Sequence, residues 1–214
     1  MFSKLQYISQ GITAHEQHVN IQSALDAGCN WIQLRFKNPE PKVLMPLAAQ
    51  IRNLCDSYSA ILIINDHPVV AHEVDAHGVH LGLNDMKITD AKKIVGANKI
   101  IGGTANTLDD VMRRHEEGCS YIGLGPFRFT RTKEKLSPVL GLNGIWKIMS
   151  ELVARKIEIP VYAIGGIVLE DAKAILQTGV WGIAVSGVIT QSADRKKLVF
   201  QFNSLLYEAV DNSQ

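Results

Sequence analysis

The stretch AGCNWIQL at residues 27–34 joins the end of a predicted helix to the start of a buried strand. A glycine ends the helix, a short turn follows, and an apolar strand begins. The chain repeats this outline twice, as EGCSYIGL at residues 117–124 and as TGVWGIAV at residues 178–185. Because a sheet built of βα units needs such helix-to-strand junctions again and again, these stretches indicate an α/β protein.

Short apolar runs recur along the rest of the chain, each bounded by glycine, asparagine, aspartate or proline. Their length is typical of strands, and they cover Leu5–Ile8, Trp31–Phe36, Ile61–Ile64, Gly78–Leu81, Lys99–Gly102, Tyr121–Gly125, Val161–Ile164 and Gly182–Val185. Helical spacing of apolar residues between the runs predicts helices over 15–27, 42–58, 68–73, 89–96, 107–117, 142–155, 168–178 and 193–210.

The number of these units predicts the architecture. Eight βα units in 214 residues average about 27 residues each, near the lower size limit of a closed (β/α)8 barrel. An open doubly wound sheet would carry a glycine-rich phosphate loop after its first strand, and the segment Ser9–Thr13 has none. No low-complexity tract or proline-rich linker divides the chain. We therefore predict a single-domain (β/α)8 TIM barrel over residues 1–214.

The composition argues against several classes of protein. With 22 Lys+Arg against 21 Asp+Glu, the formal net charge of +1 leaves no electrostatic footprint for nucleic acid. The longest uncharged run, Ala174–Ala193, holds too many polar residues and glycines for a membrane span. The first residues lack the pattern of a secretory signal, and Cys29, Cys55 and Cys119 are too few and too widely spaced for a disulfide framework. We expect a cytoplasmic protein with buried, reduced thiols and no nucleic-acid or membrane partner.

The richest polar segment follows the second predicted strand. In a barrel of this kind the active site lies at the carboxyl ends of the strands, so polar residues there are candidates for function. Gln33, Arg35 and Lys37 share one face of an alternating strand, opposite Leu34 and Phe36. Two cations and an amide donor on the inward face predict an anion site. A partly solvated strand end is the alternative interpretation.

Carboxylates follow two neighbouring predicted strands. Asn65-Asp66 comes directly after one strand, and Asp85 comes shortly after the next. Acids at adjacent strand ends that face a cationic pocket suit Mg²⁺ held together with substrate phosphates. Asp and Asn also cap helices and form turns, and this alternative stays open for each residue alone. Their joint position beside the predicted anion site favours the metal.

Two further segments suit phosphate. The loop Gly125–Lys133 carries hydroxyl and cationic donors, among them Thr130, Thr132 and Lys133. After a later strand, the bare backbone amides of Gly165 and Gly166 can approach a phosphate closely. With Ser186-Gly187 after the last predicted strand, this turn matches the phosphate site that barrels build at strands seven and eight. A solvated basic loop and an ordinary tight turn are the alternatives.

Other chemistry finds little support. His67, His72, His77 and His80 resemble a metal cluster by number, but His77 and His80 face opposite ways on a strand. Zinc is therefore not expected. The chain has no G-x-S-x-G and no C-x-x-C, which argues against a serine hydrolase and against thiol redox chemistry.

Together these segments resemble the thiamine phosphate synthase family. The shared pattern is Q-x-R-x-K at 33–37, N-D at 65–66, H-x-G-x-x-D at 80–85, G-P-x-x-x-T-x-T-K at 125–133 and I-G-G-I at 164–167. The segments follow the family's order over most of the chain. The chain departs from the family pattern where His67 replaces a second Asp, where Leu83 replaces a Gln, and where Ser186 stands one place early.

The resemblance implies a (β/α)8 transferase that joins a hydroxymethylpyrimidine diphosphate to a thiazole phosphate and releases pyrophosphate. It implies that Mg²⁺ is bound by Asp66 and Asp85 and that the diphosphate is held by Gln33, Arg35, Lys37, Asn65 and Lys133. It further implies that the thiazole phosphate is held by Thr130, Thr132 and Gly166, and that Thr104 and Lys133 act at the reacting centre. The partners would be phosphorylated small molecules. A homo-oligomer is compatible with the sequence, which does not fix the oligomeric state.

Two alternatives stay open. A sister branch of thiazole tautomerases uses a His where this chain has Asn106, so the missing base and the retained Asp66, Asp85 and Lys133 favour the synthase. The other alternative is a non-catalytic barrel that binds thiazole phosphate or thiamine phosphate.

Overall fold

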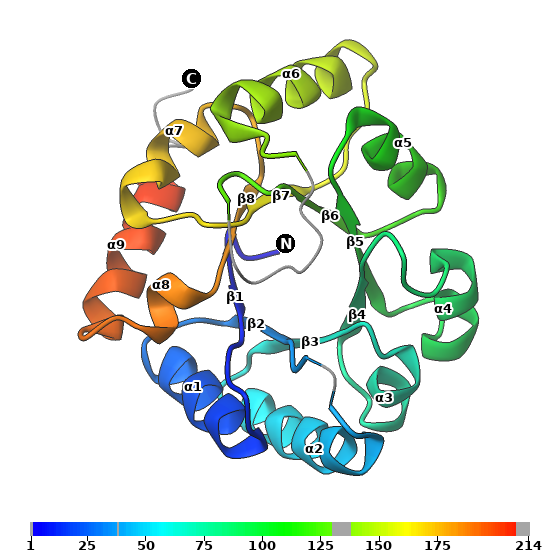
Figure 1. Cartoon of the computed structure of the whole chain (residues 1–214), viewed down its shortest axis with the longest axis vertical. Coiled ribbons are helices and arrows are strands. Elements are labelled where there is room, and N and C mark those ends of the chain that lie inside the picture. The colour runs from blue at the N-terminus through cyan, green and yellow to red at the C-terminus, as the bar shows by residue number, and fades with distance from the viewer. Residues whose placement is uncertain (1, 38, 130–137, 209–214) are drawn as a thin grey trace.

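Each strand of the chain pairs in parallel with the strand before it and the strand after it, as a computed structural model shows (Figure 1). The structure describes residues 2–37, 39–129 and 138–208. The ring closes where Leu5 of the first strand pairs with Ile183 of the last. The strands are β1 (Leu5–Ile8), β2 (Trp31–Leu34), β3 (Ile61–Asn65), β4 (Gly78–Leu81), β5 (Ile100–Ala105), β6 (Tyr121–Leu124), β7 (Val161–Ile164) and β8 (Gly182–Val185).

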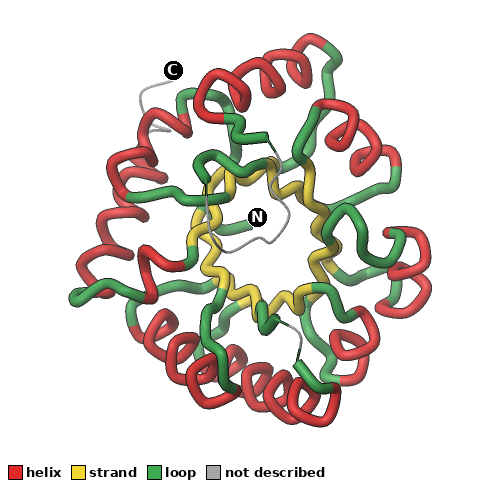
Figure 2. The backbone as a smooth tube through the Cα atoms, viewed as in Figure 1, coloured by secondary structure: helices red, strands yellow, loops and turns green. Residues whose placement is uncertain are grey.

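Helices surround the strand ring on the outside, as the tube in Figure 2 shows. Thr13 caps the first of them in a reciprocal capping box with Glu16, and Thr107 does the same with Asp110 at the fifth. The helices are α1 (Ala14–Asp26), α2 (Pro41–Ser57), α3 (Pro68–Glu73), α4 (Ile88–Val95), α5 (Leu108–Glu116), α6 (Gly141–Ala154), α7 (Ala172–Leu176), α8 (Gly187–Thr190) and α9 (Arg195–Glu208). The (β/α)8 barrel predicted from the sequence is confirmed.

Alternation along the strands divides the core into two layers. On β2, Ile32 and Leu34 point outward and join the large apolar cluster between the ring and the helices. Trp31 points inward, where it packs with Tyr121 and Tyr162. The rings of Trp31 and Tyr121 meet edge to face with centroids 5.2 Å apart. Phe2 covers this group, which we call the aromatic floor (Phe2, Trp31, Tyr121 and Tyr162) because it fills the end of the barrel at which the strands begin.

Several boundaries differ from the sequence prediction. Strand β2 ends at Leu34 rather than Phe36, and β5 runs on to Ala105. The helix predicted over 168–178 is split into a 3₁₀ turn, Leu169–Asp171, and α7, and the short helix α8 was not predicted. These differences lie at element ends, where apolar periodicity carries the least information.

The three cysteines are buried and unpaired, as predicted. Burial raises the pKa of the Cys29 and Cys55 thiols to about 12. Among the described residues, none of the helices has the length and apolar character that crossing a membrane requires.

Candidate active site

A cavity of about 840 Å³ opens at the end of the barrel opposite the aromatic floor, where the strands finish. Most residues predicted to act on substrate line it: Gln33, Arg35, Asn65, Asp66, Asp85, Thr104, Gly165, Gly166, Ser186 and Gly187. Lys37 is exposed and is not among the described lining residues, because β2 ends three residues earlier and its alternation does not continue that far. Thr130, Thr132 and Lys133 lie outside the described residues.

The two predicted metal-binding acids, Asp66 and Asp85, lie side by side in the cavity lining, and their carboxyl groups share a hydrogen bond. Asp66 follows β3 in the left-handed region, with φ of 64°. Burial, and then the hydrogen bond and the charge of Asp85, raise the pKa of Asp66 to about 7, against the opposing effects of Arg35 and Asn65. The raised pKa shows that the two carboxylates disfavour being negatively charged together. A metal cation bound by their oxygens would relieve this charge repulsion.

A tight turn aims the Asp85 carboxylate. The Gly82 N–H donates to Asp85 Oδ2 at 2.6 Å, and the Asp85 N–H points back to the Gly82 carbonyl at 3.4 Å. A Cβ on residue 82 would lie 2.7 Å from that same Asp85 oxygen, so a side chain there would force the carboxylate to move. The turn thus needs glycine at this position to keep the acid where it is.

A chain of hydrogen bonds inside the barrel leads from the amides of β1 and β2 to Thr104. Gln6 Nε2 donates to the Tyr121 hydroxyl at 3.2 Å, and Gln33 bonds the same hydroxyl. That hydroxyl lies 3.0 Å from His80 Nδ1, and His80 Nε2 lies 3.0 Å from Thr104 Oγ1. The Thr104 hydroxyl is therefore held in one orientation at the cavity edge.

His80 and Tyr121 were not assigned a role from the sequence, except that His80 stands in the family pattern. The signal was present: alternation along β4 turns Gly78 and His80 inward together. The neighbouring strand makes room for the imidazole, because a Cβ at residue 102 would lie 2.5 Å from His80 Nδ1. From sequence alone, a buried histidine is more often a packing residue than a site residue, and the space that Gly102 leaves for His80 is visible only in the structure.

The opposite wall of the cavity is a glycine turn. Gly165 and Gly166 have φ of 99° and 69°, a conformation that side chains disfavour. Arg128, a cation of the loop Gly125–Lys133 that the sequence predicts to bind phosphate, makes its hydrogen bonds to this turn instead. Its Nη1 donates to the Gly166 carbonyl at 2.7 Å, and both terminal nitrogens bond the Asp171 carboxylate. At the other end of the wall, the Ser186 hydroxyl donates to the Ile8 carbonyl at 2.6 Å.

Acids and an arginine lie on one side of the mouth, and bare backbone amides lie on the other, so each side of the cavity has groups that suit an anionic part of a ligand, with a cation between the acids and the ligand. Among the described residues, the acids form no cluster of three or more metal-binding side chains. Mg²⁺ needs no such cluster, because it commonly takes one or two carboxylates and completes its shell with water and substrate phosphates. The fold is that of a (β/α)8 barrel, and the lining of its mouth is of a kind that suits phosphorylated small molecules.

Comparison with known proteins narrows this class. The profile of the family described as thiamine monophosphate synthase matches residues 7–189. The chain belongs to this family.

Individual relatives agree. The chain is 56% identical to a thiamine-phosphate synthase of Flavobacterium johnsoniae over 98% of this chain and 99% of the relative. It is 48% identical to a thiamine-phosphate synthase of Bacteroides fragilis over 89% of this chain and 93% of that one. The solved structure of a thiamine phosphate pyrophosphorylase from Pyrococcus furiosus superposes with a TM-score of 0.84 at 32% identity, covering 97% of this chain and 96% of that chain.

Proposed function

We propose that this chain catalyses the Mg²⁺-dependent condensation of hydroxymethylpyrimidine diphosphate with a thiazole phosphate to give thiamine phosphate and pyrophosphate. Membership in the family supports the overall reaction. The observation that carries the proposal is the contact between Asp66 and Asp85 beside Arg35, at the mouth of a barrel whose facing wall is a glycine turn. Unpaired cysteine thiols support the expected cytoplasmic location.

We assign Mg²⁺ to the carboxylates of Asp66 and Asp85. Hard oxygen donors are the ligands this ion prefers, and the raised pKa of Asp66 marks a pair that a cation would stabilise. When bound, Mg²⁺ would supply positive charge to the diphosphate oxygens, on which negative charge grows as pyrophosphate leaves.

The chain's own residues hold the diphosphate on the same side of the cavity. The Arg35 guanidinium lies near Asp66 and lines the mouth, where it can donate to phosphate oxygens. Gln33 and Asn65 supply amide donors beside it. Lys37 and Lys133 complete the proposed set by resemblance to the family. Holding the leaving group with several fixed donors stabilises its developing charge.

The second substrate is proposed to bind against the opposite wall. Gly165 and Gly166, with Ser186 and Gly187, present backbone amides to the thiazole phosphate. Thr130 and Thr132 belong to this set by resemblance. An anchored phosphate on each side places the two reacting atoms between them, so the cavity turns a bimolecular encounter into a positioned one.

In the reaction the C–O bond to the diphosphate breaks, and its electron pair leaves with pyrophosphate. The electron-rich pyrimidine stabilises the carbocation-like methylene carbon. The thiazole nitrogen then forms the new C–N bond with its lone pair. No protein nucleophile is needed. We assign the Thr104 hydroxyl, which lies 3.0 Å from His80 Nε2, to a position beside the reacting carbon by resemblance to the family.

The test is direct assay of the purified chain with both substrates and Mg²⁺. Thiamine phosphate and pyrophosphate should appear together, and both should vanish when a chelator is added. Conversion of the thiazole tautomer that a chelator does not affect would show a tautomerase instead. Tight binding of thiamine phosphate without turnover would show a non-catalytic binding protein.

A further inference from the structure

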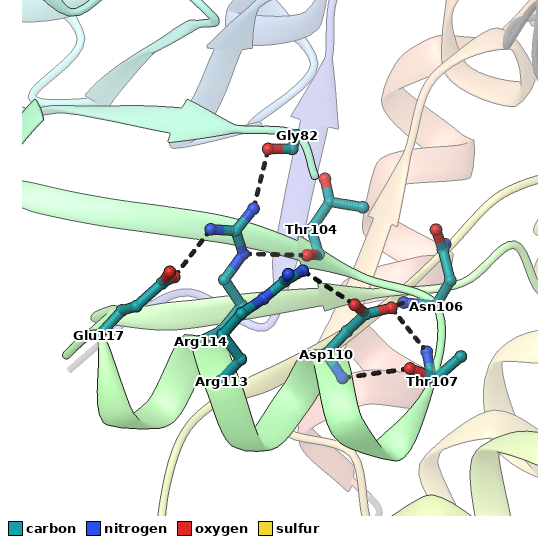
Figure 3. Close-up of polar contacts among 8 residues, drawn as sticks. All are labelled: Gly82, Thr104, Asn106, Thr107, Asp110, Arg113, Arg114 and Glu117. Carbon is teal, nitrogen blue, oxygen red and sulfur yellow. Dashed lines mark hydrogen bonds and ion pairs between the residues drawn. The ribbon is translucent and has the colours of Figure 1, made fainter. Parts of the chain in front are cut away.

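A buried arginine lies just outside the strand ring, beneath the acidic side of the mouth. Arg114 belongs to α5, where its side chain is only 4% exposed. Figure 3 shows its guanidinium reaching from the helix to two strand ends. Nη2 donates to the Gly82 carbonyl at 2.8 Å, and Nε donates to the Thr104 carbonyl at 3.2 Å. Nη1 pairs with Glu117 Oε2 at 2.8 Å, which neutralises the buried charge.

The neighbouring backbone is shaped around this side chain. A Cβ on Gly103 would lie 2.8 Å from Arg114 Cδ and 3.0 Å from its Nε, so β5 leaves this space open for the arginine. A guanidinium presents several donors in a fixed planar fork, and here the fork spans two adjacent strand ends. A lysine has one nitrogen and cannot hold both carbonyls in the same way.

Both carbonyls belong to residues that control the candidate active site. Gly82 forms the turn with Asp85, and its N–H is the donor that aims the Asp85 carboxylate. Thr104 carries the hydroxyl that His80 orients at the cavity edge. Arg114 therefore ties the turn that carries a proposed metal ligand to the strand that carries Thr104. It does so from outside the barrel and does not line the cavity among the described residues.

The adjacent arginine provides a contrast on the same helix. Arg113 is half exposed, and its Nη2 pairs with Asp110 Oδ1 at 2.9 Å within α5 (Figure 3). It reaches no strand end among its described contacts. Two arginines in sequence thus have different surroundings, one on the helix surface and one under the active site.

We propose that Arg114 is a positioning residue that fixes Asp85 relative to Thr104, so that Mg²⁺ and the diphosphate bind in register with the reacting carbon. This inference rests on the proposed function. Outer partners of metal-ligand groups commonly change metal affinity by about 10–100-fold when they are removed. A purely structural arginine would instead lower the amount of folded protein without changing what the folded protein binds.

The experiment compares Arg114→Lys with Arg113→Lys. For each, the Mg²⁺ concentration that gives half-maximal rate, the KM of each substrate, and the calorimetric affinity for Mg²⁺ in the presence of pyrophosphate are measured. We expect Arg114→Lys to weaken Mg²⁺ binding about tenfold or more by both readouts. The KM of the diphosphate should rise, that of the thiazole phosphate should stay as in the wild type, and Arg113→Lys should match the wild type throughout.

A second variant covers the case in which Arg114→Lys does not fold, as judged by circular dichroism. Glu117→Gln keeps the arginine but removes the charge that holds its Nη1, and it should weaken Mg²⁺ binding in the same direction by a smaller factor. If the folded variants bind Mg²⁺ with pyrophosphate as tightly as the wild type does, the positioning role is wrong. Absence of thiamine phosphate from the wild-type reaction would instead refute the proposed function, and the two failures are therefore separable.

Discussion

Asp66 and Asp85 follow different strands of the barrel, yet their carboxyl groups share a hydrogen bond at its mouth. The eighteen residues between them include α3, β4 and the Gly82 turn, which brings the chain back to the same edge of the ring. Parallel strands make this return automatic, because every strand ends on the same side.

Replacing one acid of the pair should stop the reaction. Asp85→Asn keeps the shape but removes the negative charge assigned to Mg²⁺, and the rate of thiamine phosphate formation should fall about 100-fold or more. Asp90→Asn is the matched control, because Asp90 is an exposed aspartate of α4 that pairs with Lys93. Equal rates in the two variants would show that the charge of Asp85 has no role in the reaction.

The same pair predicts how stability depends on pH when no metal is present. The pKa of Asp66 is raised to about 7 in the folded chain, above its value in the unfolded chain. The folded state therefore binds the extra proton, and this contribution to stability is present at low pH and lost as the pH rises towards 7. Asp66→Asn removes the titration.

In chelator, the variant should thus gain stability relative to wild type between about pH 5 and about pH 8. Urea unfolding of both proteins at the two pH values measures this difference. A wild-type minus variant difference that does not change with pH would contradict the raised pKa.

Thr104 should be sensitive to loss of its hydroxyl rather than to its size. Thr104→Val removes the partner of His80 Nε2 while keeping the branched shape, and we expect kcat to fall about tenfold, the worth of one buried hydrogen bond. Thr104→Ser keeps the hydroxyl and should restore most of the rate. Two variants of equal activity would show that the hydroxyl has no role.

Loss of the Arg128 hydrogen bonds to the glycine turn should weaken the binding of one substrate only. Arg128→Met frees the Gly166 carbonyl and the Asp171 carboxylate, and the KM of the thiazole phosphate should rise about five- to tenfold. The KM of the diphosphate should not change. Arg155→Met is the control, because Arg155 pairs with Glu151 on the outer helix α6. Equal increases for both substrates would point to a general loss of structure.

Much of the site was accessible from the sequence because the apolar runs that form the strands are easy to locate. Asp66 and Gly165 stand directly after strands and Asp85 follows another by a short turn, so the fold brings all three to one mouth. The reach of each alternating pattern was harder to judge. The alternating pattern predicts Lys37 on the inward face, but β2 ends at Leu34, and Lys37 is exposed and is not among the described lining residues.

Arg114 and Arg128 show what sequence reasoning could not reach. An arginine in a polar helix is typical of a surface, and nothing in RRHE tells Arg114 from Arg113. Their difference depends on the angle at which α5 packs and on the space left by Gly103, which are tertiary properties. Arg128 lies in a basic loop, and only the fold reveals Asp171 as its partner. The metal and substrate assignments themselves stay predictions.

The aromatic floor determines the end of the barrel at which substrates can enter and products can leave. Trp31, Tyr121 and Tyr162 pack edge to face, almost without exposed surface, across the end where the strands begin. Both substrates would then enter, and both products would leave, through the mouth at the opposite end. Pyrophosphate still bound at this mouth would compete with the next diphosphate. The turnover rate would then depend on product release as well as on formation of the C–N bond.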